Sequence, residues 1–460
     1  MKYIYLWIIL LLQSMTFTVN AKTDIKVTLD KLIEQSHQRG LFNGNASVYF
    51  RGKPILKKSI GHADAAKQNG LSVNSTFALG SISKEFSAVA IMMLHEKGLI
   101  DIDAPVSRYV SGLQAWSEEV KVKHLINYTS GLPRLNFRAV KVASDIDNQL
   151  KQISTLKFTP GEGYLYSNHN VLLQIRLIEK LTKQSYSAFL ENNFFQPLGM
   201  KNTSFNFNET NAVTAFNNDG VNDPNISFPI AIMPYSTIED MQKWLFALRT
   251  GKLVSTSSLK VLFNSFDKNS QAALGHGKLK NDKVIKHRHH GSHFNFESLV
   301  YYNAELDLQV ILLTNNKNFR LDNIISAVES IVQGKSYDVP KKSLYLAIRQ
   351  TAYDDVGQGV KFYFELKETK RDLYDFDNNS ALIRVGYKLL AQNKYQSAIK
   401  IFKLAATEFP DHANAFDSLA EAYYISGNLK AALLNYQTSV KLDPQNKNGR
   451  KMIVKINELL

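Results

Sequence analysis

The segment FALGSISKEFSAVAIMMLHEKGLI, from Phe77 to Ile100, carries the first structural and chemical signal in this chain. Ser81 and Lys84 stand three residues apart in it and are followed by a mostly apolar run. Residues three apart lie on the same face of a helix, so we expect the serine hydroxyl and the lysine amine to be neighbours. A neutral lysine can take the proton of a serine hydroxyl, and the start of a helix offers a backbone N–H to a developing oxyanion.

The Ser-x-x-Lys spacing is weak evidence by itself. It occurs five times, and the other four copies begin at Ser154, Ser257, Ser265 and Ser397. Only Ser81 follows a glycine and opens a long, nearly all-apolar helical segment. The structural alternative is that Ser81 caps the helix and Lys84 is a solvated residue of its first turn.

Two later segments contain partners that a serine nucleophile needs. FTPGEGYLYSNHNVLL contains Tyr166, a plausible proton relay, and Asn168, whose side chain can hold a substrate amide. KHRHHGSHFNFESLVYY contains His289, Gly291 and Ser292 in a strand-like pattern. A glycine on an edge strand lets a substrate backbone come close, and the N–H that follows it can complete an oxyanion hole.

Together the motifs Ser-x-x-Lys, Tyr-x-Asn and His-x-Gly resemble those of the serine β-lactamase and penicillin-binding protein superfamily. The most similar branch contains class C β-lactamases, D-alanyl-D-alanine carboxypeptidases and esterases. The segments VKVKHLINYTSGLP, FFQPLGMKNTSF and STIEDMQKW add to the resemblance, which covers about residues 26–335. It implies an α/β (α+β) β-lactamase-like fold, with an antiparallel sheet flanked by helices and an inserted helical region.

The resemblance also implies roles for the motif residues. Ser81 would be the acylated nucleophile, with Lys84 as its general base and Tyr166 assisting or delivering the proton to the leaving group. Which of the two deprotonates the serine stays open. The backbone N–H groups of Ser81 and Ser292 would form the oxyanion hole.

The substrate-binding residues implied by the resemblance are Asn168, His289, Gly291 and Ser292. Histidine is mostly neutral above pH 7, whereas a lysine at the third motif would hold a substrate carboxylate with a permanent charge. His289 therefore favours an esterase, amidase or peptidase over a true β-lactamase. The run AIMPYSTIED and the residue Asn295 replace glycines that are common in the family, so the shape of the substrate is in question.

The sequence predicts no metal and no cofactor. HRHHGSH contains four histidines, but no carboxylate stands near them at a ligand-like spacing, and a strand alternates the directions of its side chains. Cysteine is absent, which excludes disulfides, thiolate catalysis and Cys-ligated zinc.

The net charge of +14 raises the question of an anionic partner. Nucleic-acid binding is not expected, because the chain has no dense Lys/Arg run and no basic stripe with interleaved aromatics. The N-terminus has a positive Lys2, a short apolar run and small residues before Ala21, which predicts a signal peptide over residues 1–21. We therefore expect an exported protein, periplasmic or secreted, with no stable membrane span after signal cleavage.

The end of the chain has a different pattern. Residues 382–415 and 416–449 align with an offset of 34, a spacing that resembles the tetratricopeptide repeat. The expected organisation is a signal peptide (1–21), a β-lactamase-like hydrolase domain (22–338), a helical linker or cap (339–379) and tetratricopeptide repeats (380–460). Two repeats are fewer than a free-standing stack needs, so the neighbouring helices should cap them.

The favoured hypothesis is an exported serine hydrolase that acts through an acyl-enzyme on Ser81 and hydrolyses an ester or amide. Its substrate would be a small-molecule or peptide acyl donor, and the C-terminal repeats would bind a protein partner. The alternative is a penicillin-binding sensor or scaffold that acylates or binds a ligand without turnover. A third hypothesis, a binder of anionic polymers driven by the net charge, predicts salt-sensitive binding that does not need Ser81.

Overall fold

The computed structural model describes residues 25–206, 211–224 and 232–460. The signal peptide expected at residues 1–21 lies outside the described residues. The chain forms two compact units, which divide after Pro340. In the described part of the chain, no helix combines the length and the apolar character needed to cross a membrane.

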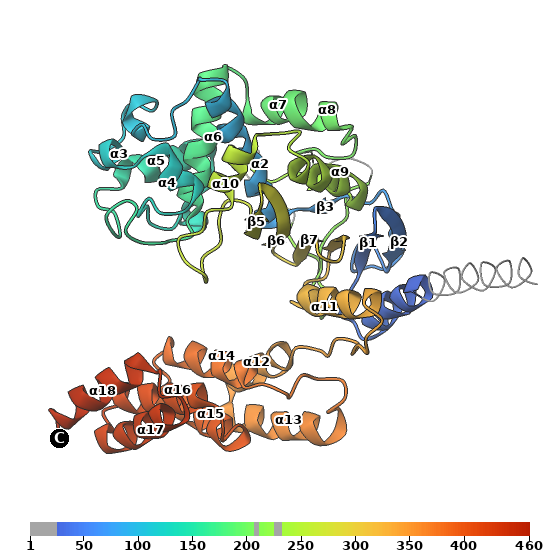
Figure 1. The fold of residues 1–460 in the computed structure, drawn as a ribbon. Helices are drawn as coiled ribbons and strands as arrows, with labels where there is room; N and C mark the ends of the chain where they lie inside the picture. The colour runs from blue at the N-terminus through green and yellow to red at the C-terminus, as the bar shows by residue number, and fades with distance from the viewer. Residues whose placement is uncertain (1–24, 207–210, 225–231) are drawn as a thin grey trace, which may run out of the picture. The chain divides into compact units, whose positions relative to one another are not determined.

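The first unit is built on a six-stranded antiparallel sheet with the order β2-β1-β8-β7-β6-β5 (Figure 1). Its strands are β1 (Gly44–Phe50), β2 (Lys53–Ile60), β5 (His276–Lys280), β6 (Lys283–His293), β7 (Phe296–Asn303) and β8 (Leu308–Thr314). A separate two-stranded sheet pairs β3 (Phe77–Ala78) with β4 (Tyr235–Ser236). The hairpin near the N-terminus thus pairs with the last strand, and Gly44 lies opposite Thr314.

The strand sequences explain why helices cover both faces of this sheet. In β8 every residue is buried, and successive side chains point to opposite faces. Val310 and Leu312 pack with helix α11 and the helical residues 25–38. Ile311 and Leu313 join the larger core under the helices of the inserted region.

The inserted helical region lies between β3 and β5 in the sequence. Besides the helical residues 25–38, the α-helices of the first unit include α2 (Ser83–Glu96), α3 (Trp116–Glu119), α4 (Val122–Ile126), α5 (Ala143–Gln152), α6 (Asn168–Thr182), α7 (Tyr186–Leu190), α8 (Gln196–Leu198), α9 (Ile238–Arg249), α10 (Thr256–Leu262) and α11 (Leu321–Val332). The expected fold class, an antiparallel sheet flanked by helices with an inserted helical region, is confirmed.

The regular secondary structure of the second unit consists of helices. Its helices are α12 (Leu344–Asp354), α13 (Val356–Thr369), α14 (Ser380–Leu390), α15 (Tyr395–Glu408), α16 (Ala413–Ile425), α17 (Leu429–Leu442) and α18 (Lys447–Asn457). Helices α15 and α17 are each 14 residues long and begin 34 residues apart. Residues of α12 and α13 share one hydrophobic cluster with α14 to α16, so the segment before the repeats contributes to their core. The assignment as tetratricopeptide repeats stays a prediction.

Candidate active site

A tight turn presents Ser81. Residues Gly80–Ile82 form a 3-10 turn, and helix α2 begins only at Ser83, so Ser81 stands just before the helix instead of opening it. Gly80 has φ +57°, a left-handed conformation that favours glycine. A Cβ atom at Gly80 would lie 2.4 Å from the backbone nitrogen of Ser292, so a larger residue would push strand β6 away from the serine.

The three residues predicted to carry the chemistry meet at one oxygen atom. Nζ of Lys84 donates to Oγ of Ser81 over 3.1 Å, and the hydroxyl of Tyr166 donates to the same oxygen over 2.9 Å. Nζ of Lys84 also lies 5.2 Å from the centroid of the Tyr166 ring. All three side chains are half-buried. Each candidate base is therefore within proton-transfer reach of the candidate nucleophile.

Packing and capping fix the position of Tyr166. Its ring lies 4.8 Å from that of Tyr128, which is 1% exposed. The next residue, Ser167, is the N-cap of α6 and accepts from the backbone N–H of His169. The hydroxyl of Ser167 donates to the carbonyl of Pro133 over 2.5 Å. These contacts hold the start of α6 against the loop that carries Pro133.

Strand β6 approaches the turn closely at Gly291. A Cβ atom there would lie 2.0 Å from the carbonyl oxygen of Leu79 and 3.0 Å from the backbone nitrogen of Ser81. The hydroxyl of Ser298, on the neighbouring strand, donates to the same carbonyl of Leu79 over 2.7 Å. The glycine thus lets the backbones around Ser81 and Ser292 lie side by side, as an oxyanion hole formed by their two N–H groups requires.

The side chain of His289, in the His-x-Gly motif, is held by a hydrogen bond. Its Nδ1 donates to Oε1 of Glu85 over 2.8 Å, and Nε2 of His287 donates to the same oxygen over 2.8 Å. The indole N–H of Trp244, on α9, donates to the other carboxylate oxygen over 2.7 Å. Glu85 is 0% exposed, and both histidines are buried. A buried carboxylate with three donors fixes the tautomer of each histidine by holding a proton on the nitrogen that faces it.

The charge state of this group follows from its partners. Burial disfavours the charged form of Glu85, but His287 and His289 outweigh it and hold the pKa of the carboxyl below its usual range. Burial has the largest effect on the pKa of His289 and lowers it, and the nearby His287 and Lys84 lower it as well, so the pKa lies below its usual value although Glu85 raises it. His289 is therefore neutral at neutral pH, and its Nε2 is buried without a hydrogen-bond partner.

The same three residues are the candidates for holding a metal ion in the described part of the chain. Ligand atoms of Glu85, His287 and His289 all lie within 4.8 Å of one another. The sequence showed no carboxylate at a ligand-like spacing from the histidines, whereas the fold brings one from α2. A proton on each imidazole lies between its nitrogen and the carboxylate oxygen, so a cation would have to displace both protons.

Three further residues were singled out in the sequence: Asn168, and Ile232 and Asn295, which stand where glycines are common in the family. Asn168 is the first residue of α6 and is half-buried; in the described structure its side chain has no recorded hydrogen bond. Asn295 is tied to Asp223 by its backbone N–H over 2.8 Å and by its side chain over 2.5 Å. Ile232 packs against the small cluster that contains Leu135 and Leu172. Asn295 is therefore fixed by hydrogen bonds to a neighbouring loop, and Ile232 is fixed by hydrophobic packing.

Sequence reasoning missed Glu85, His287 and Trp244. A signal was present for the first, because Glu85 is an acidic residue in the first turn of a helical segment that is otherwise nearly all apolar. A charged residue at such a position needs a partner. Its partners could not be named, since His287 is 202 residues away in the chain and Trp244 is 159 residues away.

Comparisons with known proteins identify relatives of this chain. The chain is similar to penicillin-binding protein 4* of Bacillus subtilis (strain 168), with 33% identity over 185 residues, which cover 38% of this chain and 40% of that protein. It is similar to protein flp of Staphylococcus aureus (strain N315), with 27% identity over 68% of each chain. The aligned region thus spans less than half of the Bacillus relative.

The structure resembles that of a penicillin-binding protein from Bacillus halodurans, with TM-score 0.58 and 21% identity over 66% of this chain and 98% of that one. At this identity the likeness concerns the fold. The family model described as Beta-lactamase matches residues 29–327, which include Ser81, Tyr166 and His289. The chain therefore belongs to the beta-lactamase family.

Proposed function

We propose that this protein is an exported serine hydrolase that forms an acyl-enzyme on Ser81. One observation carries the proposal: Nζ of Lys84 and the hydroxyl of Tyr166 lie 3.1 Å and 2.9 Å from the same serine oxygen. A protein that only binds a ligand has no need of two proton-transfer groups at one hydroxyl. The close approach of the backbones around Ser81 and Ser292 supports the proposal.

In the proposed reaction, Oγ of Ser81 attacks the acyl carbon and passes its proton to the Lys84–Tyr166 pair. The oxygen of the tetrahedral intermediate accepts from the N–H groups of Ser81 and Ser292. The bond to the leaving group then breaks, and the same pair returns the proton to the leaving oxygen or nitrogen. A water molecule attacks the acyl-serine in the second half of the reaction, which releases the acid and restores the hydroxyl.

The third motif supports a substrate that does not depend on a carboxylate. Glu85 holds His289 through Nδ1, and burial keeps the imidazole neutral, so this residue offers no positive charge to a substrate anion. Short esters or amides fit this site better than penicillins, whose carboxylate needs a cation. We therefore expect esterase or peptidase activity to exceed β-lactamase activity.

The test is acylation of the mature protein, followed by intact mass spectrometry. A fluorophosphonate, a β-lactam and a chromogenic short-chain ester are each mixed with wild type and with Ser81→Ala. We expect a single fluorophosphonate adduct on wild type, none on the variant, and faster turnover of the ester than of the β-lactam. An equal adduct on both proteins contradicts the proposal.

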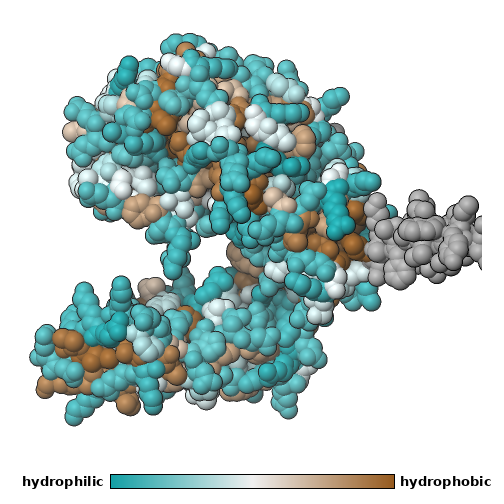
Figure 2. Space-filling model, viewed as in Figure 1, coloured by the Kyte–Doolittle hydropathy of each residue, from teal (hydrophilic) through white to brown (hydrophobic). Residues whose placement is uncertain are grey.

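A second function is favoured by the helical second unit, for which we propose binding of a protein partner. Figure 2 shows an apolar band over the helices nearest the C-terminus. Ile425, Leu434 and Val454 are exposed by 46%, 64% and 60%. If acylation gives a stoichiometric burst without turnover on all three reagents, the protein is a sensor or scaffold that uses this unit to recruit its partner.

A further inference from the structure

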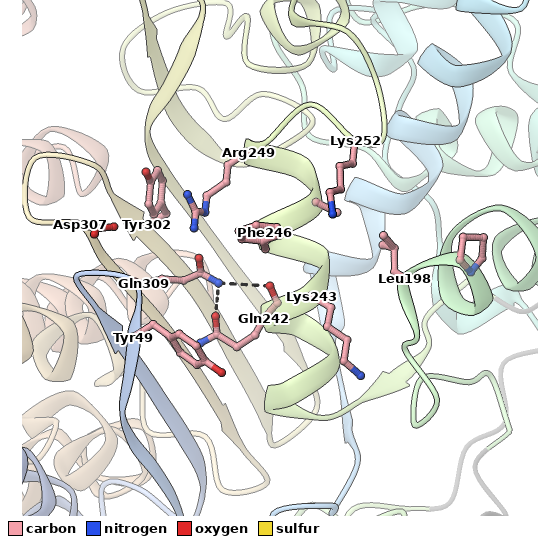
Figure 3. A pocket seen from close by; sticks show the side chains of 13 residues that line it. Tyr49, Leu198, Gln242, Lys243, Phe246, Arg249, Lys252, Tyr302, Asp307 and Gln309 are labelled. Carbon is pink, nitrogen blue, oxygen red and sulfur yellow. Dashed lines mark hydrogen bonds between the residues drawn. The ribbon is translucent and has the colours of Figure 1, made fainter.

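A cavity of about 420 Å³ lies between α9 and strands β1, β7 and β8 (Figure 3). Its lining includes Tyr49, Gln242, Phe246, Arg249, Lys252 and Tyr302. None of the lining residues belongs to the candidate active site around Ser81. The volume falls in the range of pockets that hold small organic ligands, about 300–1,000 Å³.

Two cations stand at this cavity without a carboxylate partner. Neither Arg249 nor Lys252 has a recorded ion pair in the described structure, and the Nε atom of Arg249 is buried without a hydrogen-bond partner. Two other arginines of the same unit bind carboxylates: Arg176 binds Asp147 through two nitrogens, and Arg288 binds Asp322 in the same way. The unpaired guanidinium of Arg249 is therefore available to an external anion.

Aromatic rings hold these cations in place. The guanidinium carbon of Arg249 lies 4.9 Å from the ring centroids of both Phe246 and Tyr302. Nζ of Lys252 lies 5.4 Å from the centroid of Phe246. Figure 3 shows Arg249 and Lys252 on opposite sides of Phe246. Stacking on an aromatic ring restricts a guanidinium and leaves its edge free to bind an oxyanion.

The remaining surface of the cavity suits an apolar body. Phe246 is 45% exposed and lies between the two cations, so part of its ring is open to a ligand. The polar side chains beneath it are satisfied: Gln309 donates to the side chain of Gln242, which donates to Ser47 over 3.0 Å. Asp307 is the acidic residue of the lining, and one carboxylate is too few for a metal site.

We propose that this cavity binds a small organic anion with a flat apolar body. Its carboxylate, sulfonate or phosphate is held by Arg249 and Lys252, and its apolar body lies on Phe246. The site is separate from the acyl chemistry and does not depend on it. Charge selects the ligand, because two unpaired cations favour an anion over a neutral analogue of the same shape.

The test uses the whole mature protein and 2-naphthoate as the probe, with binding measured by titration calorimetry. The neutral analogue is 2-naphthalenemethanol. The variants are Arg249→Gln and Lys252→Gln, and the matched control is Lys268→Gln, which removes one exposed charge outside the cavity. Lys252 is exposed, so its variant should fold even if the arginine variant does not. A further sample has Ser81 blocked by the fluorophosphonate.

We expect saturable binding of 2-naphthoate that weakens by about 10-fold in each cavity variant, as loss of one charge-assisted hydrogen bond predicts. Binding should be unchanged in Lys268→Gln and in the blocked protein, and the neutral analogue should bind about 10-fold more weakly. Equal binding by wild type and Lys252→Gln overturns the proposal. So does loss of binding in the blocked protein, which would place the probe in the active site, or no saturable binding up to about 1 mM.

Discussion

The hydroxyl of Tyr166 lies 2.9 Å from Oγ of Ser81 although the two residues are 85 positions apart in the chain. A buried hydrogen bond joins the two helices that directly follow them in the chain: Ser87 on α2 donates to the side chain of Gln174 on α6 over 2.8 Å. The amide of Gln174 in turn donates to the carbonyl of Leu125 over 3.0 Å. The proximity on which the proposed chemistry depends is thus built into the helix packing.

The first prediction concerns the nucleophile. Ser81→Ala should abolish the fluorophosphonate adduct while the protein stays folded. The residue caps no helix, since α2 begins at Ser83, so we expect a change in the free energy of unfolding below about 1 kcal/mol. Intact mass and urea unfolding measure the two quantities. An adduct that persists on another serine rules out this assignment.

The second prediction separates the two candidate bases. Lys84→Arg keeps the positive charge but cannot become neutral, so acylation should slow by at least about 100-fold if the lysine is the base. Tyr166→Phe removes the other proton acceptor without changing the ring that packs on Tyr128. Burst kinetics with the chromogenic ester measure each rate. Near-normal acylation in one variant assigns the base to the other residue.

The third prediction concerns the buried carboxylate. Glu85→Gln leaves three buried donors without an anionic acceptor, which should lower the free energy of unfolding by about 3 kcal/mol. Glu118→Gln, at an exposed position, is the matched control and should change it by less than about 0.5 kcal/mol. Urea unfolding compares the two variants. Equal stabilities would show that Glu85 contributes no more than a surface residue.

The fourth prediction concerns pH. Burial lowers the pKa of His289, and it lowers the pKa values of His124 and His293 to about 4. At a pH below the ordinary histidine pKa of about 6.5, these histidines bind protons in the unfolded chain but not in the folded protein. The free energy of unfolding should therefore fall as the pH drops from about 7 to 5. Each such histidine contributes a slope of at most about 1.4 kcal/mol per pH unit.

The pH prediction is checked by urea midpoints at pH 7, 6 and 5 for wild type and His289→Asn. Asparagine can keep a donor toward Glu85 but does not titrate, so the variant should show a shallower pH dependence. Parallel curves for the two proteins would mean that His289 takes up its proton equally in the folded and unfolded states.

The fifth prediction separates the two units. Arg39 donates to the carbonyls of Val339 and Pro340 over 2.8 Å and 3.1 Å, so a chain that ends after Pro340 keeps these contacts. Hydrolysis of a short ester by this truncated protein should stay within about tenfold of the full chain, a barrier change of about 1.4 kcal/mol. Loss of hydrolysis in a folded truncated protein would mean that the second unit completes the active site.

The sequence predicted the parts of this site that short motifs carry. Ser81 and Lys84 could be paired because helical spacing is local, and Tyr166 could be added because its motif resembles a known one. The role of His289 was harder to predict. Its contact with Glu85 joins residues 204 positions apart, so the local signal that marks Glu85 as an acidic residue in an apolar helix does not name the histidine as its partner.

The fold was likewise predictable where it depends on local pairing. The hairpin of β1 and β2 follows from a turn between two β-rich runs, whereas the pairing of β1 with β8 depends on tertiary packing. Likewise, the cavity beside Arg249 has no counterpart in the sequence analysis, since its lining comes from separate elements. Nothing in α9 alone shows that a strand tyrosine, Tyr302, will stack on its last residue.

The pairing of β1 with β8 has a consequence for how the chain acquires its structure during synthesis. The hydroxyl of Thr314 donates to the carbonyl of Asn43, a contact that spans 271 residues. Until β8 has left the ribosome, β1 lacks one of its two neighbours, and β7 and β6 lack the strand that joins them to it. Such long-range pairing folds slowly. The sheet of the first unit therefore stays incomplete for most of its synthesis, and a product that stops before Leu308 lacks the strand that joins its two parts.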